Sequence, residues 1–100
     1  MDPGIPDIFI GDVVTATSGR DTGGIYYVIQ EDPTYLYLAN GKDRTLDKPK
    51  RKKRKHVRKV LRSETRVAEK LRAGDKVLNG ELRRELADLC QKMQSNTLGG

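Results

Sequence analysis

The sequence predicts a mainly β fold followed by one or two short helices. Short segments rich in β-branched and aromatic residues alternate with glycine and proline turns over residues 9–62. After residue 63 there is no strand pattern, and leucines recur at spacings of three and four residues. The chain has 100 residues, of which 35% are hydrophobic, so it can build one small core.

Five short strands are expected in the first part of the chain. We place them at residues 13–17, 25–29, 35–39, 44–46 and 56–60. In the third strand, Leu36 and Leu38 alternate with tyrosines, which predicts that the leucines face one side of the sheet. Asn40 and Gly41 predict a hairpin before the fourth strand, because both residues tolerate positive φ. Five short strands with tight turns are typical of a small barrel, since closure removes the sheet edges.

Two helices are expected after the strands. Ser63 can cap a helix that runs to about Ala73 and ends at Gly74, and Asn79 can cap a second helix. The second helix carries an apolar stripe formed by Leu78, Leu82, Leu86, Leu89, Cys90 and Met93. The stripe predicts packing within the chain, with Cys90 buried, and the alternative is a docking face for a partner or a second copy.

These patterns divide the chain into four parts. We expect residues 1–8 to be a flexible lead-in and residues 9–62 to form the β domain. Residues 63–94 are the helical extension, and residues 95–100 are a disordered tail.

The positive charge is concentrated in residues 48–62, called the basic run below. The chain has a net charge of +6, yet the basic run alone holds ten basic residues and no acidic ones. Residues 1–47 contribute −5 and residues 63–100 contribute +1. Like charges this close repel one another unless a polyanion neutralises them. Phosphates do so with release of counterions, so the run predicts nucleic-acid binding, and the alternative is a solubilising segment.

Two further features suit a nucleic acid. The loop at Ser18, Gly19 and Arg20 can offer backbone N–H groups and a guanidinium to a phosphate, or it can be an ordinary turn. Tyr27, Tyr35 and Tyr37 lie on neighbouring predicted strands. They can stack on unpaired bases, or they can pack across the sheet.

Residues 11–29 form two strands around a glycine-rich loop, and this pattern resembles the KOW motif of ribosomal proteins and transcription elongation factors. The residues from Asp47 to Lys53, followed by Lys55, His56 and Val57, are similar to the last two strands of small bacterial KOW-domain RNA-binding proteins. Those proteins are similar to a family of archaeal and eukaryotic large-subunit ribosomal proteins. The resemblance covers residues 10–60 and implies a five-stranded SH3-like barrel that binds RNA, with the loop in contact with it.

The expected function is therefore RNA binding linked to ribosomes or translation, with ribosomal RNA as a candidate target and contacts mainly to phosphate. We expect the RNA-binding residues to be Ser18, Gly19, Arg20, Lys42, Arg44, Lys48, Lys50, Arg51, Lys52, Lys53, Arg54, Lys55, Arg58, Lys59 and Arg62. Two alternatives stay open. One is a module that docks on ribosomal or transcription proteins through an acidic barrel face or the leucine stripe, and the other is DNA binding.

Other classes of function lack a signature. The sequence contains no carboxylate pair, nucleophile with a base or phosphate-loop motif, so we expect no enzyme, cofactor or small-molecule substrate. His56 has no cysteine or acid cluster beside it, which argues against a metal site. Cys90 is the only cysteine, which suits a reducing compartment. There is no signal-peptide pattern and no apolar segment of about 20 residues, so we expect a cytoplasmic protein without membrane partners.

Overall fold

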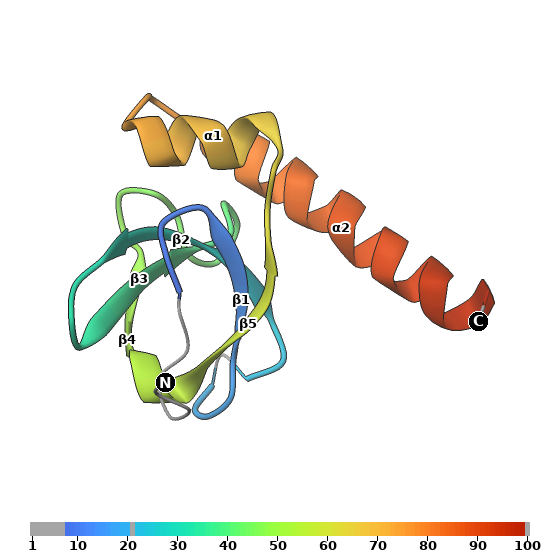
Figure 1. Ribbon diagram of the computed structural model, residues 1–100, viewed down its shortest axis with the longest axis horizontal. Helices are drawn as coiled ribbons and strands as arrows, with labels where there is room; N and C mark the ends of the chain where they lie inside the picture. The colour runs from blue at the N-terminus through green and yellow to red at the C-terminus, as the bar shows by residue number, and fades with distance from the viewer. Residues whose placement is uncertain (1–7, 21, 100) are drawn as a thin grey trace, which may run out of the picture.

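The computed structural model describes the backbone of residues 8–20 and 22–99, and side chains as far as residue 93. The predicted flexible lead-in, residues 1–8, lies outside the described residues except for Ile8, which is buried. Five antiparallel strands form one sheet in the order β4-β3-β2-β1-β5 (Figure 1). They are β1 (Asp12–Ala16), β2 (Ile25–Glu31), β3 (Tyr35–Ala39), β4 (Lys50–Lys53) and β5 (Val57–Arg62). A 3₁₀ turn, η1 (Arg54–His56), joins β4 to β5, and the helices α1 (Arg66–Ala73) and α2 (Asn79–Gly99) follow. The mainly β fold with C-terminal helices is confirmed.

The sheet curls strongly but stays open. β4 and β5 are the two edge strands, yet only the three residues of η1 separate them in the chain. Such a connection reaches at most about 14 Å between the flanking Cα atoms, so the two edges approach each other at this end. The strand pairings within the described residues do not join β4 to β5. The structure is therefore an open five-stranded sheet, and a closed barrel is not confirmed.

The fourth strand lies later than the sequence predicts. The prediction of a strand at residues 44–46 is wrong. Thr45 forms only an isolated bridge with Lys48, and the paired strand begins at Lys50. The basic run itself thus supplies the fourth strand of the sheet.

Hydrogen bonds explain the course of the chain before β4. The N–H groups of Asn40 and Gly41 both donate to the Arg44 carbonyl, and Gly41 has a φ of 78°, which favours glycine. The chain therefore makes a compact turn instead of a two-residue hairpin. The N–H of Leu46 then donates to Asn79 Oδ1 at 2.8 Å, which ties this segment to the start of α2.

The concave face of the sheet buries an inner cluster. It consists of Ile8, Val14, Tyr26, Val28, Leu36, Leu38 and Val57. No helix contributes to this cluster, so the curl of the sheet itself encloses these side chains. Leu36 and Leu38 are both fully buried, and the predicted alternation along the third strand is confirmed.

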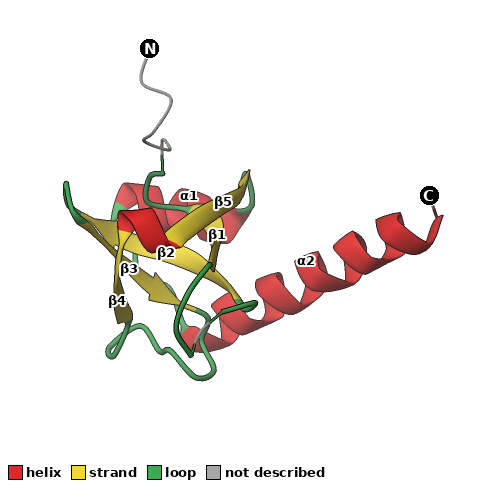
Figure 2. Cartoon of the chain, turned by 90° about the horizontal axis from the view of Figure 1, so that it is seen from below, coloured by secondary structure: helices red, strands yellow, loops and turns green. Residues whose placement is uncertain are grey.

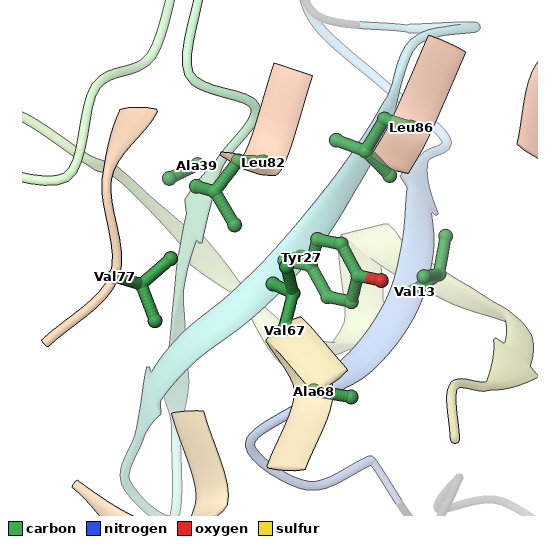
Figure 3. Close-up of a cluster of buried hydrophobic side chains, with 8 residues drawn as sticks. All are labelled: Val13, Tyr27, Ala39, Val67, Ala68, Val77, Leu82 and Leu86. Atoms are coloured by element: carbon green, nitrogen blue, oxygen red, sulfur yellow. The ribbon is translucent and has the colours of Figure 1, made fainter. Parts of the chain in front are cut away.

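The opposite face buries an outer cluster beneath the two helices (Figure 3). Its buried members are Val13, Tyr27, Ala39, Val67, Ala68, Val77, Leu82 and Leu86. Leu82 and Leu86 of the leucine stripe therefore pack within the chain, as the sequence predicts, whereas Leu78 at its start is 57% exposed. Further along α2 the stripe leaves the sheet, since Met93 is 40% exposed and Cys90 is exposed. The prediction that Cys90 is buried is wrong.

The caps of α1 are partly as predicted. Its N-cap is Thr65, whose hydroxyl accepts a hydrogen bond from the Ala68 N–H, and not Ser63. The side chain of Ser63 instead turns inward, where its Oγ lies 3.0 Å from the Tyr27 hydroxyl. Gly74 ends the helix with a φ of 78°, as expected for a glycine C-cap.

The start of α2 uses a different cap from the predicted one. Asn79 bonds to Leu46, so its side chain does not close the first turn. The Glu81 carboxylate does so by accepting the Leu78 N–H at 3.0 Å, and this contact lowers the pKa of Glu81. The helix extends to Gly99, beyond the predicted end at residue 94, and its C-terminal half projects away from the sheet (Figure 2). In the part of the chain described, no helix has both the length and the apolar character to cross a membrane.

The hydroxyl of Tyr27 is enclosed by the elements that follow the sheet. It lies 3.0 Å from Ser63 Oγ and 3.2 Å from Thr65 Oγ1, and it donates to Glu85 Oε1 at 3.3 Å. Burial is the main reason that the pKa of Tyr27 is raised, and the negative charge of Glu85 acts in the same direction.

This raised pKa predicts a loss of stability in alkali. The unfolded tyrosine ionises near its ordinary pKa of 10.0, whereas the folded one keeps its proton to higher pH. Tyr27 therefore stabilises the fold fully below that pKa, and this contribution is lost as the pH rises through the folded value. Urea unfolding at pH 8 and pH 11 should show a smaller decrease in Tyr27→Phe than in the wild type. Tyr35→Phe, which removes a partly exposed hydroxyl, is the control. Equal decreases in all three proteins would contradict the buried hydroxyl.

Candidate nucleic-acid interface

Two lysines of β4 lie on the inner side of the sheet edge. The register pairs Lys50 with Leu38 and Lys52 with Leu36. Directly paired residues share a face, so these lysines point to the same side as the buried leucines. Both lysines are only partly buried because β4 is an edge strand. Their ammonium groups can therefore reach the rim of the sheet.

The loop between β1 and β2, residues 17–24, lies against this rim. Lys52 Nζ donates to the Ser18 carbonyl at 2.8 Å, across 34 positions of sequence. The N–H of Thr17 donates to the His56 carbonyl of η1 at 2.9 Å. Figure 1 shows the loop and η1 together at the end of the sheet opposite α1. Arg20 is exposed in this loop, so the structure brings it to the end where the basic run turns.

Gly19 gives the loop its shape. It has a φ of 84°, and its carbonyl accepts a hydrogen bond from Thr22 Oγ1 at 2.6 Å. A Cβ atom at this position would come within 2.8 Å of Lys52 Nζ. The positive φ therefore favours glycine here, and a larger residue would in addition displace the lysine ammonium.

The outer side of the same strands combines cations with aromatic rings. Arg51 and Lys53 pair with Tyr37 and Tyr35, so the four side chains share one face. Arg51 Cζ lies 4.5 Å from the centroid of the Tyr35 ring, which is a cation–π distance. Both tyrosines are partly exposed, because the helices cover this face only near Ala39. This surface can present rings and positive charge to an incoming base.

The prediction that Tyr27 stacks on bases is wrong. Its ring is 2% exposed and lies in the outer cluster beneath α1 and α2 (Figure 3). The alternation of β2 places Tyr27 on the side that the helices cover, so its ring cannot reach a base. The predicted stacking set reduces to Tyr35 and Tyr37.

Arg54 holds the fold together at the turn after β4. Its Nε donates to the Asp32 carbonyl at 2.9 Å, and one terminal nitrogen donates to the Ile8 carbonyl at 3.1 Å. The other terminal nitrogen lies 2.9 Å from Glu31 Oε1 in an ion pair. These contacts occupy the guanidinium, so they do not support the predicted role of Arg54 in RNA binding.

Arg54→Ala should therefore destabilise the protein. Loss of three charge-assisted hydrogen bonds at a partly buried site should lower the free energy of unfolding by about 1–3 kcal/mol. The neighbouring Lys55 is exposed, so Lys55→Ala should change it by at most about 0.5 kcal/mol. Urea denaturation of the two variants measures the difference, and equal stabilities would contradict the structural role of Arg54.

Lys59 and Arg62 also face carboxylates of the chain. Asp12 is completely buried, and its Oδ2 lies 3.2 Å from Lys59 Nζ and accepts the Phe9 N–H at 2.8 Å. Arg62 Nε lies 3.0 Å from a carboxylate oxygen of Glu64. Among the described residues no ion pair neutralises the other cations of the basic run: Lys48, Lys50, Arg51, Lys52, Lys53, Lys55 and Arg58.

A cavity of about 330 Å³ opens beside η1. It is lined by Pro33, Thr34, Lys53, Arg54 and Lys55. Thr34, which the sequence marks only as part of a turn, is the lining residue that lay outside the predicted site together with Pro33. The neighbouring Asp32 carboxylate accepts the N–H groups of Tyr35 and Thr34, which lowers its pKa. Asp32 thus stays charged and limits how close an anion can approach on this side.

Lys42 and Arg44 belong to the compact turn before β4 and not to the strand itself. Lys42 lines a second cavity with Arg83 of α2. The structure therefore does not unite the predicted RNA-binding cations into one surface. We call Arg20 and the unpaired cations of β4, η1 and the start of β5 the basic surface: Arg20, Lys50, Arg51, Lys52, Lys53, Lys55 and Arg58. Lys50 and Lys52 lie on the inner side of the edge strand and Arg51 and Lys53 on its outer side, whereas Lys48 lies before β4, in the bridge to Thr45.

No group of three or more histidine, cysteine, aspartate or glutamate side chains that could hold a metal ion occurs in the described part of the chain. No protein-family model matches the sequence, and no curated protein matches it. The function of the chain is therefore inferred from its own residues and their geometry.

Proposed function

We propose that this chain binds RNA, mainly through phosphates, at the basic surface. The observation that carries this proposal is the 2.8 Å hydrogen bond from Lys52 Nζ to the Ser18 carbonyl. It places the glycine-rich loop with Arg20 against a strand made only of basic residues. Two segments far apart in the sequence thus supply positive charge to one end of the molecule.

The charge of this surface favours a polyanionic partner. Its seven cations form no ion pair with a carboxylate among the described residues, whereas Arg54, Lys59 and Arg62 do. Uncompensated cations on adjacent positions repel one another, and phosphates remove this repulsion with release of counterions. The basic surface is therefore complementary to a nucleic-acid backbone.

The tyrosines favour RNA over duplex DNA. Tyr35 and Tyr37 are partly exposed beside Arg51 and Lys53. Proteins recognise single-stranded RNA loops by stacking unpaired bases on aromatic rings and guanidinium planes, and duplex DNA keeps its bases stacked.

We further propose that the chain is a cytoplasmic KOW-family protein with an SH3-like barrel that acts with ribosomes or in translation. The glycine-rich loop between the first two strands and the basic run in the last two support this proposal. Sucrose-gradient sedimentation of a cell lysate tests the role in translation. The protein should sediment with ribosomal particles, and confinement to the light fractions would contradict that role.

A titration with matched nucleic acids tests the RNA preference. We expect a labelled RNA stem-loop with an unpaired loop to bind at least about tenfold more tightly than a DNA duplex of the same stem sequence, because only the RNA offers unstacked bases. A DNA hairpin with the same loop separates stacking from recognition of the 2′-hydroxyl. Equal affinity for RNA and duplex DNA would contradict the proposal.

Arg20→Ala should weaken RNA binding without affecting the fold. The loss of one charge-assisted contact to a phosphate should lower the binding free energy by about 1–2 kcal/mol. Arg20 is exposed, so the melting temperature should stay the same. Arg66→Ala removes an exposed arginine of α1 and is the matched control. Unchanged RNA affinity of Arg20→Ala would exclude the loop from the interface.

A further inference from the structure

A second cavity, of about 350 Å³, lies where α2 leaves the sheet. It is lined by Ile25, Asn40, Lys42, Arg83, Leu86, Ala87 and Cys90. The apolar lining residues come from β2 and α2, whereas Asn40 and Lys42 come from the turn before β4. Residues from three segments distant in sequence therefore line one open, largely apolar cavity.

Two cations lie at this cavity without a carboxylate of their own. Lys42 and Arg83 are exposed, and no ion pair between described residues includes either of them. The cavity has no acidic lining residue. Elsewhere on the helices Lys70 pairs with Glu81, and Lys92 pairs with Asp88. The cavity thus combines an apolar lining with uncompensated positive charge.

The shape of the molecule leaves this region accessible. Beyond the turns that pack on the outer cluster, α2 projects away from the sheet (Figure 2). The cavity lies along this departing helix, since Leu86, Ala87 and Cys90 all line it. An incoming chain segment can therefore lie in the angle between helix and sheet and contact both.

We propose that this cavity docks a segment of another protein in which an apolar side chain is flanked by carboxylates. The apolar side chain rests against Ile25, Ala87 and Cys90, which are at least partly exposed, and the carboxylates meet Lys42 and Arg83. The volume lies at the lower end of the range for ligand pockets, which suits an anchoring side chain of a peptide. This inference is independent of RNA binding, because the basic surface contributes no residue to the cavity.

Three synthetic peptides with the same Leu-Phe centre test the proposal on the full chain. Their flanks are two Glu, two Gln or two Lys residues on each side. At about 1 mM, a concentration that detects weak dissociation constants, the Glu peptide should shift the amide NMR signals of residues 40–42 and 83–90. It should also slow the alkylation of Cys90, the only cysteine of the chain. Absence of shifts, or equal binding of the Gln peptide, would overturn the proposal.

A matched pair of charge reversals locates the binding. Arg83→Glu should weaken binding of the Glu peptide by about tenfold, because an attractive contact becomes repulsive. Arg84→Glu makes the same change in net charge on the next residue of α2, which is exposed but does not line the cavity. Arg84→Glu should change the affinity for the Glu peptide by no more than about twofold relative to the wild type. Equal effects of the two variants would show that only the overall charge of the protein attracts the peptide.

Sedimentation equilibrium tests the alternative that a second copy of the chain, and not another protein, occupies the cavity. The protein should stay monomeric without peptide. Self-association that Arg83→Glu abolishes and Arg84→Glu does not would assign the cavity to a second copy and overturn the proposal.

Discussion

Replacing Arg51, Lys52, Lys53 and Lys55 together by glutamine should remove most of the salt dependence of RNA binding. If the wild type neutralises about six phosphates, its affinity should fall by about 10³-fold between 50 and 200 mM salt. The variant would neutralise only about two, so the same change in salt should weaken its binding by about tenfold. Fluorescence anisotropy titrations at several salt concentrations measure both slopes.

The control for this variant removes four cations elsewhere. Arg66, Lys76, Arg84 and Lys92 are all exposed and belong to the helical part of the chain. Their replacement by glutamine gives the same net charge as the first variant but leaves the basic surface intact. Its salt slope should stay close to that of the wild type. Equal slopes for the two variants would mean that total charge, and not the basic surface, governs binding.

Leu82→Ala should cause the largest loss of stability. Leu82 is completely buried in the outer cluster, between α2 and the sheet. Removing a buried leucine side chain loses its transfer free energy and leaves a cavity, so the free energy of unfolding should fall by about 2–5 kcal/mol. This is a large fraction of the total stability of a domain of this size. Urea denaturation measures the change.

Leu78→Ala is the matched control, because Leu78 lies just before α2 and is 57% exposed. Its effect should be at most about 0.5 kcal/mol. A stable Leu82→Ala variant would mean that the helices do not help to build the core, and that the β part is stable without them.

Local patterns predicted most of the elements. The alternation at Leu36 and Leu38 indicated the third strand and showed that both leucines share one face, which the structure identifies as the buried one. The spacing of Leu82 and Leu86 indicated α2 and its packing side. Gly74 marked the end of α1, since a positive φ favours glycine. In each case a few neighbouring residues determine the result.

Predictions failed where a distant partner determines the structure. Ser63 has a good capping side chain, but Tyr27 binds its hydroxyl and Thr65 caps α1 instead. Asn79 likewise bonds to Leu46, whose segment was expected to be a strand. These hydrogen bonds join residues that are more than thirty positions apart in the chain. No window of local sequence contains them.

The candidate site was likewise predictable only in part. The concentration of charge in residues 48–62 is visible in the sequence, and so is the exposed loop at Arg20. The sequence does not show which of these cations remain unpaired, because Arg54 and Lys59 form ion pairs with carboxylates of other strands. The alternation of β2 could have shown that Tyr27 faces the helices, but only after the covered side of the sheet was known.

Amide NMR mapping of the full chain with the RNA stem-loop tests the location of the RNA interface most directly. The signals that shift should belong to residues 18–20, to the partly exposed tyrosines of β3, and to residues 50–58. Residues 79–93 of α2 should stay unchanged. Shifts concentrated on α2 and on residues 40–42, with β4 and the loop unaffected, would contradict RNA binding at the basic surface.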